Sequence, residues 1–204
     1  MASLDPLMKP SRCNSHRPEF ERLPLRAHEF LDGVPLHDVW TVDLPRIRRG
    51  ITLAEFLARA NCLPRQLPPG VRTLLSVRFF IGGLFGWDRA SQGSISESFA
   101  LRLTDEDRTR SLVSPGTRDG LFRIVYRFEN EQLNEVINRT AHAAALSVLV
   151  EGEASYRYYF AVYVREVNRL TRYYMAAIDP FRKWIVYPAL LGGIAEEWNA
   201  IFAG

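Results

Sequence analysis

His142 is the side chain whose place in the sequence best fits acid–base chemistry. It shares an alternating phase with Asn138 and Leu146 within residues 132–150, which we predict to be a strand. Alternate residues of a strand point to the same side, so His142 and Asn138 are expected to point into the core. A buried imidazole near neutral pH can act as a general base or as a hydrogen-bond partner for a ligand. A single histidine on an apolar face is more often a structural residue, so both interpretations stay open.

The tyrosines give the larger signal, and it favours binding. Tyr126 and Tyr158 lie on the apolar phases of two further predicted strands, whereas Tyr159 faces the other way from Tyr158. Aromatic rings with a polar tip suit a pocket that orients a flat or amphipathic molecule. Cross-strand packing also favours aromatic residues, so only some of the tyrosines are expected to line a pocket. The predicted ligand-binding residues are Phe99, Tyr126, Asn138, His142, Tyr158 and Trp184.

Motifs for the common enzyme chemistries are missing from the sequence. The glycine-rich segment 82–86 is not followed by the Lys-Ser or Lys-Thr of a phosphate-binding loop. No serine stands in a Gly-x-Ser-x-Gly elbow. Two cysteines, Cys13 and Cys62, are too few for a disulfide framework, and the remaining histidines cannot be combined into a metal site from their spacing. The sequence therefore predicts neither a metal nor a cofactor, and it assigns no catalytic residue.

Charge and hydropathy narrow the class of protein further. The formal charge of +3 comes from arginines scattered among acidic residues, without the basic run typical of nucleic-acid binding. The N-terminal segment has prolines and charges where a signal peptide needs an apolar stretch. The longest apolar run, 184–195, is interrupted by Pro188 and is shorter than the roughly 18 residues that a membrane span requires. These features predict a cytoplasmic protein that binds no nucleic acid and spans no membrane.

Five prolines in residues 1–36 predict a loosely ordered leader whose deletion leaves the fold intact, ahead of one domain at 37–204. The domain is expected to begin with a strand at 37–44. Thr52 and Glu55 form a capping-box pattern that predicts a helix at 53–62, and an apolar stripe predicts a second helix at 71–85. Alternating residues suggest strands at 95–103 and 109–114, and Asp105 to Asp107 are interpreted as a solvated loop.

The last third of the chain carries the strongest patterns. Residues 121–129, 132–150 and 156–168 alternate with period 2 and predict an antiparallel meander with one face inward. Asp179-Pro180 is typical of a helix start, and apolar residues repeat at helical spacing from there to Phe202, with a kink expected at Pro188. The predicted fold is α+β: a curved antiparallel sheet around a long C-terminal helix, with two shorter helices after the first strand.

Two segments carry a resemblance to a known family. LLSVRFFIGGLFGWD (74–88) and YYMAAIDPFRKWIVYPAL (173–190) resemble an uncharacterised bacterial family of the START/Bet v 1-like (SRPBCC, helix-grip) superfamily. The similarity covers residues 37–202, and its motifs are structural in kind. The resemblance implies an apolar pocket enclosed by the sheet and the terminal helix. Members of that family also occur fused behind a short-chain-dehydrogenase-like domain, and we do not expect such a domain in this chain.

We therefore expect the protein to bind a small hydrophobic or amphipathic ligand in a cavity between the sheet and the C-terminal helix. Two alternatives use the same architecture. One is an enzyme of the polyketide cyclase/aromatase kind, in which polar groups of the cavity move protons. The other is an interaction module for a partner protein such as a separate oxidoreductase. Fold alone does not choose among them.

Overall fold

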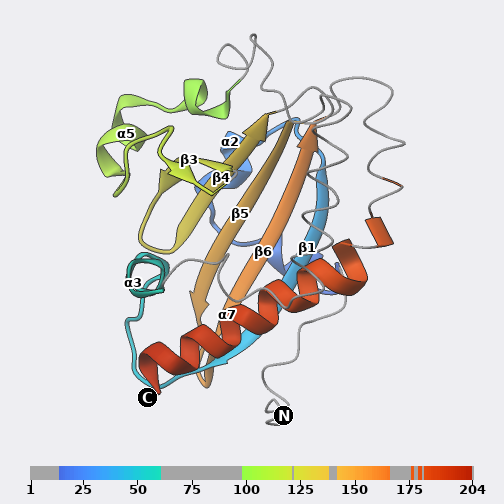
Figure 1. Ribbon diagram of the computed structural model, residues 1–204. Helices are drawn as coiled ribbons and strands as arrows, with labels where there is room; N and C mark the ends of the chain where they lie inside the picture. The colour runs from blue at the N-terminus through green and yellow to red at the C-terminus, as the bar shows by residue number, and fades with distance from the viewer. Residues whose placement is uncertain are drawn as a thin grey trace.

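The computed structural model describes residues 14–60, 98–120, 122–137, 142–165, 176, 179–180 and 182–203. The helix predicted at 71–85 and the candidate ligand residue Asn138 lie outside these residues. None of the described helices is long and apolar enough to cross a membrane. The described chain has an α+β architecture with a central sheet and a C-terminal helix, as the sequence predicts (Figure 1).

An antiparallel six-stranded sheet in the order β1-β6-β5-β4-β3-β2 forms the centre of the protein. The predicted first strand is confirmed, and its closing Pro45 is the last residue of β1. Strands β2 to β6 pair in the order in which they follow one another along the chain. Strand β1 pairs with β6 and forms the other edge of the sheet. The strands are β1 Leu36–Pro45, β2 Arg118–Asp119, β3 Phe122–Arg127, β4 Glu131–Ile137, β5 His142–Glu151 and β6 Ser155–Arg165.

The meander is confirmed, but the predicted single strand at 132–150 is wrong. It is two strands, β4 and β5, with Ile137 opposite His142 at the closed end of the pair. Period-2 patterning continued through both strands, and alternation alone does not report a reversal of direction. A register shift between Ile124 and Tyr126 also interrupts β3, so Val125 joins the core on the same side as Tyr126.

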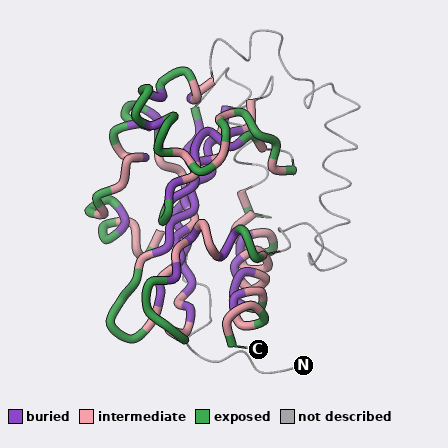
Figure 2. The backbone as a smooth tube through the Cα atoms, turned by 90° about the vertical axis from the view of Figure 1, so that its left-hand side faces the viewer, coloured by how far each residue is buried: buried purple, intermediate pink, exposed green. Residues whose placement is uncertain are grey.

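The sheet is covered on both faces. On one side, which we call the α7 face, α3 (Leu53–Arg59) and α7 (Tyr187–Phe202) pack on β1, β5 and β6. On the other side, which we call the α2 face, α1 (Arg17–Phe20), α2 (Arg26–Phe30) and the 3-10 helix η2 (Phe99–Arg102) pack on β3 to β6. Figure 2 shows buried residues along the strands and on the side of α7 turned toward the sheet. The predicted cap of α3 is present, since the Thr52 hydroxyl accepts the Glu55 amide at 3.1 Å.

The C-terminal helix departs from prediction at its start. Residues Arg182–Val186 form a π-helical segment, η3, and regular α-helix begins only at Tyr187, with Pro188 in its first turn. Trp184 was expected in the buried stripe, but it is 81% exposed, so that prediction is wrong. A π-helical turn rotates successive side chains by less than an α-helical turn, so a phase counted from Trp198 does not carry back to Trp184. The buried stripe consists of Tyr187, Leu191, Ile194, Ala195 and Trp198.

Residues 14–36 are not loosely ordered, which corrects the prediction for this part of the leader. Pro18 lies in the first turn of α1, where its missing N–H is tolerated, and Phe20 and Phe30 are buried on the α2 face. The Asn14 side chain accepts the Val39 amide at 2.7 Å, which ties the segment to β1. Prolines at helix starts and in turns are compatible with a packed segment, so proline content alone misjudged it.

Replacing Phe20 by alanine is expected to lower the free energy of unfolding by about 3–5 kcal/mol, because the ring is fully buried. It packs against the Tyr159 ring, with the two ring centroids 5.7 Å apart. Urea unfolding followed by tryptophan fluorescence measures this loss. Arg22→Ala, two residues further at an exposed position, is the control and should change little. If Phe20→Ala and Arg22→Ala have equal free energies of unfolding, the leader is dispensable for the fold after all.

The segment after residue 97 also differs from prediction. Where strands were expected at 95–103 and 109–114, the described residues form η2 and then α5 (Asp105–Arg110). Thr104 and Asp107 make a reciprocal capping box, with acidic residues in the first turn of α5 and basic residues in its last turn. Asp107 is buried and binds Arg26 through two hydrogen bonds of 3.0 Å, which joins α5 to α2. The acidic run is thus a helix start and not a solvated loop.

Candidate functional site

A buried carboxylate–histidine pair lies on the α2 face. Glu135 of β4 accepts hydrogen bonds from the Ser98 hydroxyl, from the Phe99 amide at 2.9 Å and from His142 Nε2 at 3.2 Å. The Phe99 ring stacks on the imidazole with centroids 4.0 Å apart. Glu135 and His142 are 3% and 0% exposed. The expectation that His142 is buried is therefore confirmed, and the structure brings it together with Phe99.

Hydrogen bonds favour the ionised form of Glu135. Burial alone would raise the pKa of Glu135, but the hydrogen bonds from His142, Ser98 and Phe99 outweigh it and hold the pKa below its ordinary value. An ionised carboxylate accepts hydrogen bonds only, so His142 Nε2 carries a proton. The other ring nitrogen, Nδ1, is sealed from solvent and has no hydrogen-bond partner among the residues that the structure describes.

Tyr126 lies on the same face but on β3, beside Glu131 and not beside His142. Its hydroxyl and Glu131 Oε1 are both buried without a regular hydrogen bond within the described part of the chain. Burial, with the nearby Glu131 carboxylate, raises the pKa of Tyr126 well above its ordinary value. The ring packs edge-on against Phe30 and stacks on Phe128. We interpret Tyr126 as a core residue that supports α2.

Tyr158 lies on the opposite side of the sheet, on the α7 face, where its hydroxyl donates to Ser147 Oγ at 2.8 Å. Burial, only partly offset by this hydrogen bond, raises the pKa of Tyr158 to about 12. It is therefore a neutral polar group in an apolar layer at physiological pH. The predicted ligand residues that the structure describes do not line one space, because Phe99, Tyr126 and His142 are separated from Tyr158 by the sheet.

One row of cross-strand neighbours on the α7 face runs from aromatic to polar. Trp40 is opposite Phe160, Phe160 is opposite Ser147, and Ser147 is opposite Gln132. Arg127 follows on β3 and donates to the Gln132 side chain. At the aromatic end, the Trp40 indole N–H is buried with no acceptor among the described residues. The centre of this face is lined by small β5 side chains, those of Ala143, Ala145 and Ser147.

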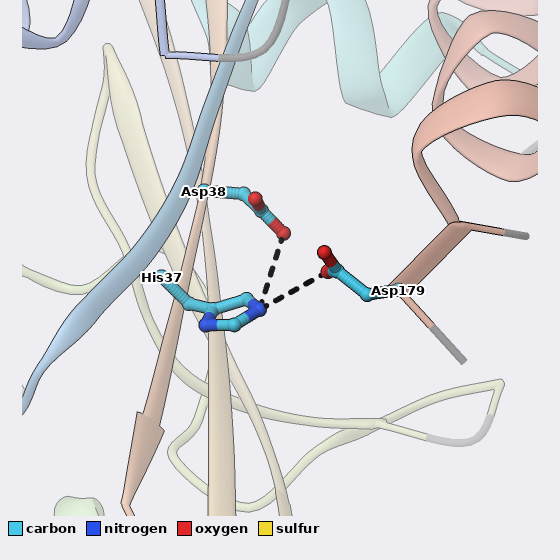
Figure 3. A group of neighbouring side chains, drawn as sticks. All are labelled: His37, Asp38 and Asp179. Carbon is cyan, nitrogen blue, oxygen red and sulfur yellow. Dashed lines mark hydrogen bonds and ion pairs between the residues drawn. The ribbon is translucent and has the colours of Figure 1, made fainter. Parts of the chain in front are cut away.

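At one end of this face, charged residues gather where β1 meets the start of the C-terminal helix. Figure 3 shows His37 and Asp38 of β1 and Asp179 pointing toward one another. His37 Nε2 is 3.3 Å from Asp179 Oδ1 and 3.8 Å from Asp38 Oδ2. The three residues could each offer a ligand atom within 4.8 Å of the others, which is a first requirement for a metal site.

Two cations already neutralise these carboxylates. Arg182 pairs with Asp38 and with Asp179, and Lys183 Nζ is 2.6 Å from Asp179 Oδ2. Burial would raise the pKa of Asp179, but hydrogen bonds from Lys183 and His37 hold it below its ordinary value. A cation bound here would have to displace two side chains that match the carboxylates in charge. We interpret the cluster as the ion-paired attachment of η3 to β1.

Residues 30–189 match the protein family described as Protein of unknown function (DUF2867). The chain belongs to this family. Searches of curated proteins and of solved structures found no significant match. The resemblance drawn from the sequence is thus supported as far as an uncharacterised domain family.

The DUF2867 match includes the whole sheet, the Glu135–His142 pair and the row of residues from Trp40 to Gln132. It begins at Phe30, after α1, and ends within α7 before Leu191. The match therefore leaves out α1, all of α2 except Phe30, and all of α7 beyond its first three residues, although each of these helices contributes buried residues.

Sequence reasoning missed Glu135, Ser147 and Gln132. Glu135 shares the strand phase of Leu133, and an acidic residue in an apolar phase was the signal that could have found it. Ser147 lies among alanines and valines and carried no comparable signal. Trp184 projects into solvent, so it borders neither face.

Proposed function

We propose that this DUF2867 protein binds a small amphipathic molecule between the α7 face of the sheet and the C-terminal helix, as a START/Bet v 1-like helix-grip domain does. The observation that carries the proposal is the Trp40 indole N–H, which is buried without an acceptor among the described residues. Leaving such a donor unpaired costs about 1–3 kcal/mol, and a ligand acceptor would recover it.

The surroundings of Trp40 support an amphipathic ligand. Its row offers aromatic surface at Phe160 and hydrogen-bonding groups at Ser147 and Gln132. Pockets that bind small molecules combine an apolar lining with a few polar groups that fix orientation. The small side chains of Ala143 and Ala145 occupy little volume in the middle of the face.

The enzyme alternative loses its main candidate in this arrangement. A cyclase-like enzyme needs a proton acceptor in the cavity, and His142 lies on the opposite face of the sheet. Tyr158, which does lie on the α7 face, keeps its proton at physiological pH because its pKa is raised to about 12. Binding without chemistry is therefore the function that we propose for this face.

The proposal predicts that Ala145→Phe blocks binding. The probe is 1-anilinonaphthalene-8-sulfonate. Its aromatic rings suit the apolar lining of the α7 face, and its sulfonate can accept a hydrogen bond from the Trp40 indole N–H. Native protein should enhance its fluorescence, and Ala145→Phe should weaken the affinity at least tenfold. If the space is open, this variant keeps its melting temperature within about 3 °C, because the new ring fills a void and does not displace packed atoms.

Trp184→Ala is the control, since it removes an exposed aromatic ring that could bind the dye nonspecifically. It should retain full dye affinity. Unchanged dye affinity in Ala145→Phe would contradict the proposal. A large loss of stability in that variant would contradict it as well, because it would show that side chains already fill the space.

A further inference from the structure

A structural role explains why Glu135 is buried beside η2, but it does not explain why its partner is His142. Glu135 holds the start of η2 through Ser98 and the Phe99 amide, which accounts for the carboxylate. It does not account for a histidine at position 142. An apolar side chain there would avoid burying a second polar nitrogen, and apolar replacements of buried polar groups are commonly neutral or stabilising.

The ring nitrogen Nδ1 is a defined acceptor. In the neutral form of the ring, the Nε2 proton lies toward Glu135 and Nδ1 presents a lone pair. Its position is fixed by the hydrogen bond on one side and by stacking on Phe99. A carboxylate that orients a histidine so that the other nitrogen is free to accept a proton or hydrogen bond is the arrangement of many binding and catalytic histidines.

The surroundings restrict what the acceptor could take. The ionised Glu135 disfavours a second anion in this low-dielectric position, so carboxylates and phosphates are poor candidates. Directly opposite His142 are Ile137 on β4 and Arg165 on β6, and Arg165 is exposed. The next α2-face residues along β5 and β6, Ala144 and Tyr163, are buried in the core. An uncharged molecule with an apolar body and a hydroxyl donor fits both the charge and the lining.

We propose that His142 is the anchor of a second binding site, on the α2 face, for a neutral hydroxylated aromatic molecule whose O–H donates to Nδ1. This site is independent of the one proposed on the α7 face, because the sheet separates them. A hydroxyl bound in this way completes the hydrogen bonds of the imidazole without altering the pair with Glu135.

The test uses 2-naphthol as the donor probe and 2-methoxynaphthalene as a probe of nearly the same shape without the donor. Protein labelled with ¹⁵N-histidine gives ring-nitrogen signals, and those of His142 are the ones missing from His142→Gln. If that variant does not fold, His16→Gln, His28→Gln and His37→Gln assign His142 by elimination. The free protein should show His142 with a protonated Nε2 and a bare Nδ1.

Addition of 2-naphthol should shift the Nδ1 signal toward that of a hydrogen-bonded nitrogen, with an affinity at least tenfold tighter than that of 2-methoxynaphthalene. The same shift should occur in Ala145→Phe, which leaves the α2 face intact. Equal shifts with both probes, or none with 2-naphthol, would overturn the inference. An Nδ1 signal already typical of a hydrogen-bonded nitrogen in the free protein, and unmoved by 2-naphthol, would show that the nitrogen binds water only and would also overturn it.

Discussion

Replacing Trp198 by alanine is expected to lower the free energy of unfolding by about 3–5 kcal/mol, the largest loss expected in α7. The side chain is fully buried on the α7 face, between Phe56, Tyr156 and Phe202, with ring centroids 4.7–5.5 Å away. Its indole N–H also donates to the Pro45 carbonyl at 3.0 Å, which ties α7 to the end of β1. The melting temperature should fall by about 6–20 °C.

Trp184→Ala is the matched control for this prediction. The same substitution at an 81% exposed position should change the melting temperature by at most a few degrees. Calorimetry on both variants compares the two tryptophans directly. A larger loss from Trp184 than from Trp198 would mean that the opposite side of the C-terminal helix faces the sheet.

Glu135→Gln is the second substitution with a large expected effect, about 2–6 kcal/mol, because two of the three buried donors that Glu135 serves lose their acceptor, at about 1–3 kcal/mol each. Glutamine offers one acceptor oxygen where Glu135 serves three donors, from Ser98, Phe99 and His142. Urea unfolding at pH 7 measures the loss. Glu29→Gln, at an exposed ion pair with Arg26, is the control and should cost little. Equal losses from the two substitutions would contradict a special role for the buried pair.

The same variant should change the response to acid. The pKa of Glu135 is lowered in the folded protein, so the folded state favours the ionised form. Its contribution to stability is complete above the unfolded-state pKa, about 4.3 for glutamate, and is lost as the pH falls through the lower folded-state value. Glu135→Gln should therefore flatten the decline of stability below about pH 4.3. Asp107 and Asp179, whose pKa values are also lowered, should keep part of that decline in the variant.

The sequence alone predicted the elements whose signals are local. The first strand, the capped helix at Thr52 and the alternating strands of the meander follow from side-chain periodicity and from hydrogen bonds between near neighbours. The burial of His142 and the opposite orientations of Tyr158 and Tyr159 also follow from strand phase. These outcomes depend on the geometry of one strand or one helical turn, and a few residues specify that geometry.

Contacts between distant segments were decided only by the tertiary structure. Glu135 and His142 share a face because the chain reverses direction between β4 and β5. The alternation of apolar and polar residues in the sequence does not show that reversal. Phe20 is buried because the proline-rich segment that contains it packs against Tyr159 of β6. Trp184 is exposed because a π-helical turn shifts its phase relative to Trp198. Tyr126, His142 and Tyr158 are buried as their strand phases predicted, but a sheet buried on both sides has two apolar phases. Only the packing of α7 on one face and of α2 on the other separates Tyr158 from His142.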